Sequence, residues 1–565
     1  MYPKQPSYST YVQTPEQVIR SDLLQTIDQN QPHICEELIK ADPKRVHEIG
    51  WNNLTPLHQV CLRGNLGILQ ILLRNGAKLD ARSSFGETPL HYACRRGDVR
   101  IIHILIKAGS DVTAIDKQSR TCMHFVASGG SVVAMHYLGT QTQLSYDAKD
   151  GVGDTALHLA CFHRHFYLVN YLLRKGRSDP KQQNIKGITA LHIAAQMGNS
   201  EIVWKLLVVG HCGLLHIKDE TGDTPVDVAR KEMTSRHKEV VEALRYYSSQ
   251  DPHTAPAGPK FTWYSLLLLP FMWSGLVFYL SSYFNSHAGY FALIMLITLV
   301  VIVGRQSHRI HHASRWPNPV HLGAFAAGIL HCIIAAYGRI IASMWPCYFT
   351  GLAVMALSVS CLYYLYYLSH GDPGILKHSK TINGRSLTIV DVALGRCKEE
   401  HFCIYTEVIK PDKTKFCRLC ERVVVGLDHH CLFIMNCVAE KNHRSFVIFI
   451  FNVMTLQVFF VFESYLYVTS VYPNSVTESY FSILFHYEPW IFNLCLLCVF
   501  AFVWECTLMY VQLGSIMKGE TAYFSTHGHL TLTWKERLNN ILKFFLKSNK
   551  RDKERYLSKT SLLLT

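Results

Sequence analysis

Two patterns of apolar and polar residues divide the chain. In the first 250 residues, short apolar segments recur, each after a tetrapeptide related to Thr-Pro-Leu-His. The copies begin at Thr55, Thr88, Thr121, Thr155, Thr189 and Thr224, so the successive spacings are 33, 33, 34, 34 and 35 residues. A Thr can cap a helix, Pro fits its first turn, and the Leu faces a neighbouring copy. Because no copy buries its apolar face alone, the pattern predicts a stack of short helix pairs.

A glycine supports this interpretation near the end of the first helix in each pair. It stands nine residues after the Thr in four copies, at Gly64, Gly97, Gly130 and Gly198. Arg164 takes this place in the copy that begins at Thr155. A left-handed residue at this position would end the first helix, and glycine adopts that conformation most easily.

The second pattern consists of long apolar segments, which come after a polar linker at residues 248–260. Residues 261–304 contain no Asp, Glu, Lys or Arg, and at about 20 residues per crossing they allow two membrane helices in a hairpin. Further spans are predicted at 320–341 and 345–368, from 446 onward, and at 489–513. Six crossings would place both ends of the chain on one side of the membrane.

The distribution of Lys and Arg predicts the orientation of these spans. The turns at 282–289 and around Ser343 and the loop at 470–489 contain neither residue, whereas the opposite loops and the tail are basic. We therefore expect the repeats, the loop after the fourth span and the C-terminal tail in the cytosol. Arg339, near the far end of the third span, is the one basic residue against this pattern, and it could snorkel to the interface.

Composition agrees with a membrane protein that carries a soluble part. Of the 565 residues, 49% are hydrophobic and 17% are charged, whereas about 25% of residues are charged in ordinary soluble proteins. The net charge of +14 fits cytoplasmic loops better than a nucleic-acid site, so we expect no nucleic-acid partner. The 18 cysteines are too sparse for a disulfide framework and indicate buried thiols, metal ligands or a nucleophile.

Two acidic residues, Glu463 and Glu505, fall inside predicted spans. An ionisable group within the membrane is a candidate for function. A partner within the helix bundle is the more ordinary explanation, and we assign these residues no site.

The loop between the fourth and fifth spans contains a cluster of metal-ligand residues. Cys417 and Cys420 are separated by two residues, and His430 and Cys437 follow within a stretch of 21 residues. Three thiolates and one imidazole form a tetrahedral donor set that is typical of structural zinc. Because a short irregular loop has little else to fold around, metal binding would supply its stability. The cluster predicts one structural zinc ion.

One cysteine of this stretch, Cys431, is left over once the zinc ligands are assigned. It lies two positions after His429 and three after Asp428. A histidine can take the proton of a nearby thiol, and a carboxylate can orient that histidine, so the three residues could form a nucleophilic site. Cys431 also lies a few residues before a span, where a long acyl chain could enter the bilayer. The alternative is a zinc-binding loop without chemistry.

The repeats resemble ankyrin repeats over residues 20–247, on the strength of their period and the Thr-Pro-Leu-His core. Residues 22–41 would supply an atypical first helix pair and residues 236–247 the last helix. The resemblance implies a surface that recruits client proteins, although the stack could also only solubilise or tether the rest of the chain. The motif histidines are expected to be buried and hydrogen-bonded, without chemistry.

The loop resembles the DHHC family of protein S-acyltransferases (palmitoyltransferases), and specifically the members with ankyrin repeats and six spans. The residues that carry the resemblance are Asp428-His429-His430-Cys431, Asp372-Pro373-Gly374, Asn436-Cys437 and residues 442–446. It implies that Cys431 attacks a long-chain acyl-CoA and passes the acyl group to a cysteine of a client protein. His429 would be the general base, Asp428 its orienting partner and His430 a zinc ligand. It also implies location in Golgi or other endomembranes.

Three departures from the family pattern favour an alternative function. The family's first zinc site corresponds to Cys403, Thr406, Phe416 and Val423, of which only Cys403 is a ligand type. That site is expected to be lost, and packing around Phe416 and Val423 to replace it. The family's Pro-Trp-Val is Leu432-Phe433-Ile434, and its Thr-Thr-x-Glu is Thr521-Ala522-Tyr523-Phe524.

The alternative is a membrane scaffold that kept the fold and lost efficient transfer, although retention of all four Asp-His-His-Cys residues favours an enzyme. Ankyrin repeats before six spans also occur in cation channels. A channel would need a pore loop between the last two spans and would leave the Cys/His loop unexplained.

We therefore expect a mainly α-helical chain, with an ankyrin solenoid, a six-helix transmembrane domain and a small cytosolic zinc-binding loop. The predicted boundaries are a disordered N-terminus at 1–19, repeats at 20–247, a linker at 248–260, four spans within 261–368, the cysteine-rich loop at 369–445, two spans within 446–513, and a cytosolic tail at 514–565.

Overall fold

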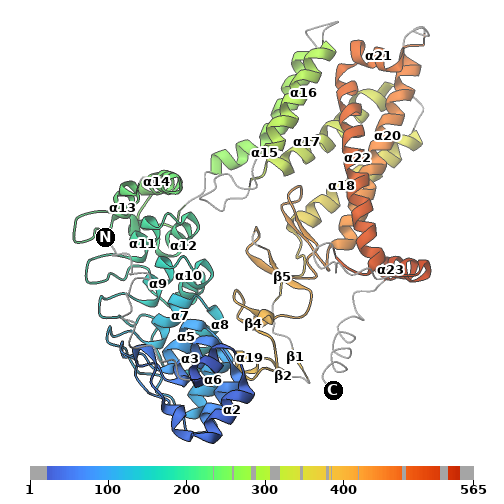
Figure 1. Cartoon of the computed structure of the whole chain (residues 1–565). Coiled ribbons are helices and arrows are strands. Elements are labelled where there is room, and N and C mark those ends of the chain that lie inside the picture. The colour runs from blue at the N-terminus through green and yellow to red at the C-terminus, as the bar shows by residue number, and fades with distance from the viewer. Residues whose placement is uncertain are drawn as a thin grey trace. The chain divides into compact units, whose positions relative to one another are not determined.

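The computed structural model describes residues 22–232, 234–256, 260–281, 288–305, 318–343, 348–376, 381–382, 385–417, 419–473, 479–521 and 532–546. The predicted disordered N-terminus lies outside these residues. The chain forms two compact units (Figure 1). The repeat unit consists of Met1–Ala257 and Ser379–Lys410, and the membrane unit consists of Gly258–His378 and Pro411–Thr565.

The repeat unit is a stack of helix pairs, as predicted. The first helices of the pairs are α3 (Pro56–Arg63), α5 (Pro89–Arg96), α7 (Cys122–Gly129), α9 (Ala156–Phe162), α11 (Ala190–Gln196) and α13 (Pro225–Lys231). The second helices are α4 (Leu66–Arg74), α6 (Val99–Ala108), α8 (Val132–Gln141), α10 (Phe166–Leu173), α12 (Ser200–Gly210) and α14 (Ser235–Ser248). An initial pair, α1 (Asp22–Asp28) and α2 (Pro32–Ala41), packs on α3 and α4.

The motif threonines and histidines connect each repeat to the next. The Thr88 hydroxyl lies 2.9 Å from Nδ1 of His91, whose other ring nitrogen lies 3.1 Å from the carbonyl oxygen of Ala114. His58, His124, His158 and His192 make the equivalent contact with a later backbone carbonyl. Burial lowers the pKa of His91 to about 4, so its ring is neutral near pH 7. These rings are buried and hydrogen-bonded, as expected.

The residues that end the first helices adopt the predicted left-handed conformation. Gly64, Gly97 and Gly130 have φ values of 84°, 80° and 81°. Arg164 also has a positive φ, of 60°, although it carries a side chain. A left-handed residue other than glycine costs about 1–2 kcal/mol. The repeat geometry therefore imposes this conformation even where the sequence lacks glycine.

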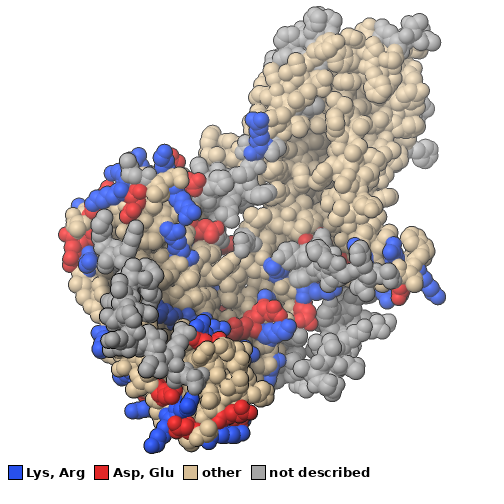
Figure 2. Space-filling model, in the orientation of Figure 1, with Lys and Arg blue, Asp and Glu red and all other residues tan. Residues whose placement is uncertain are grey.

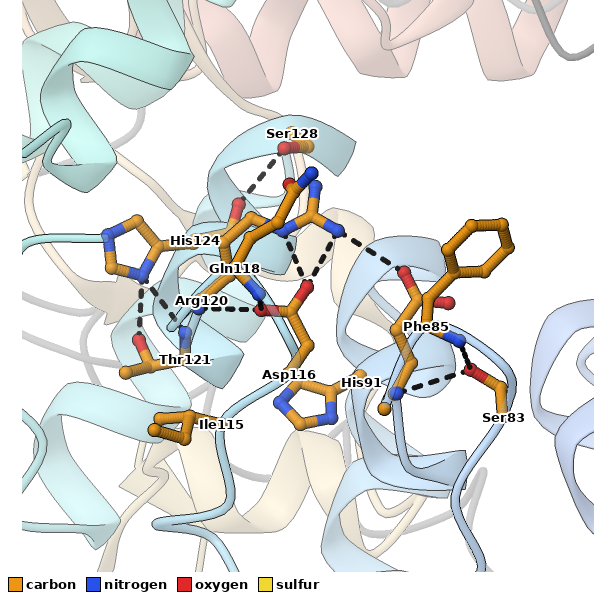
Figure 3. A network of polar contacts seen from close by, with 12 residues as sticks. Ser83, Phe85, His91, Ile115, Asp116, Gln118, Arg120, Thr121, His124 and Ser128 are labelled. Atoms are coloured by element: carbon orange, nitrogen blue, oxygen red, sulfur yellow. Dashed lines mark hydrogen bonds and ion pairs between the residues drawn. The ribbon is translucent and has the colours of Figure 1, made fainter. Parts of the chain in front are cut away.

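An ion-pair network joins two neighbouring repeats (Figure 3). Arg120, just before α7, contacts Asp116 at 2.7 Å and reaches Glu87 of the preceding repeat at 3.4 Å. Its guanidinium also lies 4.8 Å from the centre of the Phe125 ring. Both carboxylates are buried and depend on this cation. The network therefore fixes the spacing between the second and third repeats.

A second stretch of chain belongs to the repeat unit. Within the described residues of Ser379–Lys410, the elements are β1 (Thr381–Ile382), β2 (Arg385–Ser386), α19 (Ile389–Ala393), a short 3-10 helix (Glu399–His401), β3 (Phe402–Cys403) and β4 (Val408–Ile409). β1 pairs with β2 and β3 with β4, both antiparallel. α19 packs on α6 and α8, and Ile389 and Val392 are buried. Part of the predicted cysteine-rich loop thus folds with the repeats.

The membrane unit contains long apolar helices. They are α15 (Lys260–Ser281), α16 (Ala288–Gly304), α17 (Val320–Ala335) with a π-helical extension (Ala336–Ile341), α18 (Tyr348–His370), α20 (His443–Val471) and α22 (Pro489–Lys518). In the described part of the chain, four stretches are long and apolar enough to cross a membrane: Val320–Ile341, Thr350–His370, His443–Val471 and Pro489–Lys518. Figure 2 shows Lys, Arg, Asp and Glu spread over the repeats, whereas the long helices present an almost uncharged face.

The last two long helices extend beyond the predicted spans. α20 begins at His443 instead of residue 446, and α22 continues to Lys518 instead of residue 513. The predicted loop at 470–489 contains a short helix, α21 (Tyr480–Tyr487), and α23 (Trp534–Leu546) comes after α22. Hydropathy marks the apolar middle of a helix, whereas its polar ends need capping and packing to define them.

Arg339, the one basic residue against the predicted orientation of the spans, has a specific partner. Its Nη2 donates to Oε1 of Glu488 at 2.8 Å, and the Tyr467 hydroxyl donates to the same oxygen at 2.7 Å. Glu488 is buried, while the Arg339 side chain is 55% exposed. The arginine therefore neutralises a buried carboxylate at the end of the bundle.

Two small hairpins complete the membrane unit. β5 (Thr414–Cys417) pairs with β6 (Arg422–Val425), and β7 (His429–Cys431) pairs with β8 (Asn436–Val438), both antiparallel. The Asn436 amide donates to the carbonyl oxygens of Leu368 (2.9 Å) and Gly371 (3.0 Å) at the end of α18. These bonds attach the second hairpin to the long helices.

Candidate active site and zinc centre

The four predicted zinc ligands lie together. Cys417 ends β5, and Cys420 lies in the turn to β6. His430 of β7 lies directly across from Cys437 of β8 in the strand register. The ligand atoms of these four residues are all within 4.8 Å of one another. Two hairpins therefore converge on one point, as a structural zinc site requires.

The spacing of these ligand atoms fits a zinc ion. Nδ1 of His430 lies 3.7 Å from Sγ of Cys417, 3.2 Å from Sγ of Cys420 and 3.8 Å from Sγ of Cys437. The Sγ atoms of Cys420 and Cys437 are 3.5 Å apart. A tetrahedral zinc ion with Zn–S bonds of about 2.3 Å needs sulfur atoms about 3.8 Å apart and sulfur–nitrogen distances of about 3.6 Å. The cluster could therefore bind zinc after small adjustments.

The alternation of side chains along β7 separates two kinds of chemistry. Successive residues of a strand point to opposite faces. His430 lies in the ligand cluster, so His429 and Cys431 face the other way. Cys431 is 7% exposed and belongs to the apolar core formed with the long helices. The strand thus places a thiol beside the membrane helices while its central residue faces the zinc cluster.

His429 contacts Asp428, the carboxylate predicted to orient it. Its Nδ1 lies 2.8 Å from Oδ2 of Asp428, whose side chain is fully buried. Although burial lowers the pKa of His429, hydrogen bonds to Asp428 and Cys431 outweigh burial and raise it to about 9. Because Asp428 occupies Nδ1, Nε2 is the ring nitrogen that can exchange a proton with a thiol. The three predicted residues form a connected set.

Asp428 has a further partner that sequence reasoning missed. Nε2 of Gln512, on α22, donates to the same Oδ2 of Asp428 at 3.0 Å. Oε1 of Gln512 in turn contacts Nε2 of His443 at the start of α20. All three side chains are buried. A polar residue in a predicted span was the available signal, because such residues usually serve a partner or a site.

The Asp372-Pro373-Gly374 motif joins α18 to the first hairpin. The Asp372 carboxylate accepts hydrogen bonds from the backbone N–H groups of Gly374 and Ile375, both at 2.9 Å, and from Lys441 at 2.7 Å. Although burial opposes it, these bonds hold the pKa of Asp372 well below its usual range. Ile375 then forms an antiparallel bridge with Val424 of β6. The motif positions the zinc hairpins after the fourth predicted span.

The residues that depart from the family pattern lie in both the repeat unit and the membrane unit. Phe416 and Val423 lie opposite each other in the β5–β6 pair, and Val423 is buried, which supports replacement by packing. Cys403 and Thr406 belong to the repeat unit. Phe433 packs near the rings of Phe325 and Trp504, with centroid distances of 5.9 and 5.0 Å. The Thr521 hydroxyl donates to the carbonyl oxygen of Leu427 at 3.2 Å, whereas Phe524 lies outside the described residues.

The two acids inside the spans lie in the helix bundle. Glu505 on α22 accepts a hydrogen bond from the amide of Gln457 on α20 at 3.1 Å. Glu463 on α20 is fully buried. The Glu505 contact matches the expectation of a partner within the bundle, and neither acid belongs to the site around Cys431.

Comparisons with known proteins identify both parts of the chain. Residues 396–529 match the DHHC palmitoyltransferase family. Residues 23–116 and 169–255 match ankyrin repeats in three copies, and residues 152–185 match a single ankyrin repeat. The repeats predicted from their period and the domain predicted from Asp428 to Cys431 are therefore confirmed.

Curated relatives align with more than half of this chain. The palmitoyltransferase AKR1 of Saccharomyces cerevisiae is 26% identical over 409 residues, which cover 67% of this chain and 52% of the relative. The palmitoyltransferase ZDHHC17 of Mus musculus is 26% identical over 350 residues, covering 58% and 52%. The chain thus spans about half the length of these relatives. The crystal structure of the human ASB11 ankyrin repeat domain matches 41% of this chain and 100% of its own, with 25% identity and a TM-score of 0.36.

Proposed function

We propose that this chain, which combines a DHHC palmitoyltransferase domain with ankyrin repeats, is a membrane-embedded protein S-acyltransferase that uses long-chain acyl-CoA. The observation that carries the proposal is the arrangement on β7. His429, held by Asp428 at 2.8 Å, shares a strand face with the buried thiol of Cys431. The match to the DHHC family and the relatives named palmitoyltransferases support the same conclusion.

The first half-reaction forms an acyl-enzyme. The proton of the Cys431 thiol moves to Nε2 of His429, whose raised pKa favours an imidazolium paired with a thiolate, and this thiolate attacks the thioester carbonyl of acyl-CoA. A new thioester bond forms at Cys431 while the bond to coenzyme A breaks. The departing coenzyme A thiolate receives the proton from His429. Asp428 stabilises the imidazolium that exists between these proton transfers.

The second half-reaction transfers the acyl group to a client. The thiol of a client cysteine gives its proton to His429 and attacks the thioester carbonyl at Cys431. The bond to Cys431 breaks, and Cys431 regains a proton from His429. Client proteins would be recruited by the ankyrin repeats, which commonly present a protein-binding surface.

Zinc would have a structural role in this enzyme. Cys417, Cys420, His430 and Cys437 would hold one ion and lock the two hairpins together. The ion would supply folding energy, and the proton transfers would remain with His429. Since His430 belongs to the same strand as Cys431, zinc binding would fix the position of the nucleophile.

The membrane arrangement that supports this function has six spans. α15 and α16 would add two crossings to the four established candidates, because the sequence from 261 to 304 contains no charged residue. The distribution of Lys and Arg would place the repeats, the Cys/His loop and the tail in the cytosol, where acyl-CoA and client cysteines are available. The family resemblance favours Golgi or other endomembranes. The boundaries predicted from the sequence are kept in this proposal, except that Ser379–Lys410 of the cysteine-rich loop is assigned to the repeat unit.

The second candidate function is a membrane scaffold that binds client proteins without efficient transfer of an acyl group. The observation that favours it is the substitution of Thr406, Phe416 and Val423 at the positions of a second zinc site. The scaffold would keep client binding and membrane insertion. It predicts a folded, zinc-loaded protein that accepts no acyl group.

Autoacylation separates these two functions. Purified full-length protein is incubated with a labelled long-chain acyl-CoA, and the label is tested for release by hydroxylamine, which cleaves thioesters. We expect label on the wild type, none on Cys431→Ser, and a strong loss on His429→Ala. A folded, zinc-loaded wild type that stays unlabelled would establish the scaffold instead.

A further inference from the structure

The repeat unit holds a carboxylate of the cysteine-rich loop in a clamp of basic side chains. Glu407 lies at the tip of the β3–β4 hairpin, and its Oε2 lies 2.8 Å from Arg177 and 3.0 Å from Lys175. These two residues come after α10 in the fourth repeat. The Glu407 side chain is 8% exposed and that of Arg177 is 13% exposed. Removing one partner of an ion pair shielded from water in this way costs more than removing one partner of a surface pair, because the other charge stays buried.

The contacts around this clamp extend along one face of the repeats. Arg174 donates to the carbonyl oxygen of Ile404 at 3.2 Å. The ring of Phe402 lies 5.1 Å from that of His136 on α8, and Tyr405 lies 6.2 Å from Tyr167 on α10. These partners all come from second helices of repeats or from the turn after α10. The segment therefore runs along the second-helix face of the stack.

The side chains of the clamp are themselves braced by the repeats. The Arg177 guanidinium lies 4.2 Å from the centre of the Tyr171 ring and donates to the Tyr171 carbonyl oxygen at 3.2 Å. Nδ1 of His136 lies 3.0 Å from the Tyr171 hydroxyl. Tyr171 is buried in α10, so it gives both Arg177 and His136 a fixed partner within the repeats.

The hairpin held by the clamp contains two positions of the lost zinc site. Cys403 is buried, and the backbone N–H of Thr406 points at its Sγ from 3.4 Å. Thr406 offers a hydroxyl where a thiolate would be needed, so these residues do not fit a zinc ion. Glu407 is the next residue and has a left-handed φ of 59°. The turn that would have surrounded zinc instead presents a carboxylate to two cations of the repeats.

We propose that the second-helix face of the second, third and fourth repeats is a built-in docking surface for the segment 385–410, and that the ion pairs of Glu407 with Arg177 and Lys175 anchor its β3–β4 hairpin on the repeats, whereas packing replaces zinc at Phe416 and Val423. The docked segment leads directly into the zinc-binding hairpins, because Lys410 precedes the zinc ligand Cys417 by only seven residues. The repeats would then support acyl transfer directly, apart from recruiting clients. This consequence rests on the proposed acyltransferase function, whereas the docking itself does not.

Charge reversal at the clamp tests the proposal on the full-length protein in detergent micelles. Glu407→Lys places a cation against Arg177 and Lys175. Glu400→Lys is the matched control, because it makes the same charge change on the same segment at a side chain that is 68% exposed. Hydrogen exchange of residues 402–409 reports docking, and autoacylation without any client reports the effect on transfer.

We expect Glu407→Lys to accelerate amide exchange of the hairpin and to slow autoacylation, each by about tenfold, since it breaks a buried ion pair. Glu400→Lys should change neither measurement. The double variant Glu407→Lys with Arg177→Glu should restore both, provided that exchange in α10 stays as in the wild type. Restoration is expected because the reversed pair has the same attraction.

Three results would each overturn a different part of the proposal. Wild-type exchange in Glu407→Lys would show that the clamp does not hold the segment. Faster exchange with unchanged autoacylation would show that docking does not support transfer. A wild type without label would refute the proposed function, while the exchange measurements would still decide whether the segment is docked.

Discussion

Gln512 offers a sharp test of how the site is built, because it reaches Asp428 from a different helix. Its amide donates to Oδ2 of Asp428 at 3.0 Å, and this oxygen also faces Nδ1 of His429 at 2.8 Å. Gln512→Leu keeps a similar volume and removes the donor. The carboxylate would lose one of these two contacts and could rotate away from His429.

The size of the effect can be worked out from the charge of the acceptor. A hydrogen bond to a charged group contributes about 1.5–3 kcal/mol. Each factor of ten in rate corresponds to about 1.4 kcal/mol. If the bond orients His429 in the transition state, Gln512→Leu should slow autoacylation by about 10- to 100-fold. Binding of acyl-CoA should change little, because Gln512 supports Asp428 and is not expected to touch the substrate.

Single-turnover labelling at saturating acyl-CoA measures this rate. Val511→Ala is the matched control, since Val511 is the neighbouring residue on α22 and is 47% exposed. Zinc content and thermal melting establish that both variants are folded. If folded, zinc-loaded Gln512→Leu reacts at the wild-type rate, Gln512 does not position the catalytic pair.

The zinc cluster, the Arg339 ion pair and the strained Arg164 each give a further expectation. Cys437→Ser should lose the bound zinc and melt at a lower temperature, whereas Cys431→Ser should keep one zinc ion per chain. Metal analysis of the purified proteins measures the zinc content, and two zinc ions per wild-type chain would refute the single site. Arg339→Met should destabilise the protein by about 1–2 kcal/mol, because it leaves the buried Glu488 without its cation. The double variant with Glu488→Gln should recover part of this loss, and thermal melting in detergent measures both. Arg164→Gly should stabilise the repeats by about 1 kcal/mol in the same assay, since glycine tolerates a φ of 60°, and an unchanged melting temperature would show that Arg164 makes compensating contacts.

Much of the fold could be predicted from the sequence because its signals are local. The period of 33–35 residues and the Thr-Pro-Leu-His core predicted the helix pairs, and the glycines predicted their left-handed ends. That Arg164 adopts the same conformation came from the structure. Hydropathy located the four established candidate spans to within a few residues. The Cys417-x2-Cys420 spacing, with His430 and Cys437 nearby, predicted the ligand cluster. In each case, the interacting residues are close in sequence or belong to a repeated unit.

The sequence by itself therefore determined the repeats, the apolar helices and the identity of the Cys/His loop. Tertiary structure alone decided that Gln512 supports Asp428, 84 positions away, and that Glu407 meets Arg177 across 230 positions. Contacts of this kind depend on how one helix or hairpin is rotated and positioned against another. Those quantities result from packing over the whole unit, and a local pattern of residues does not specify them.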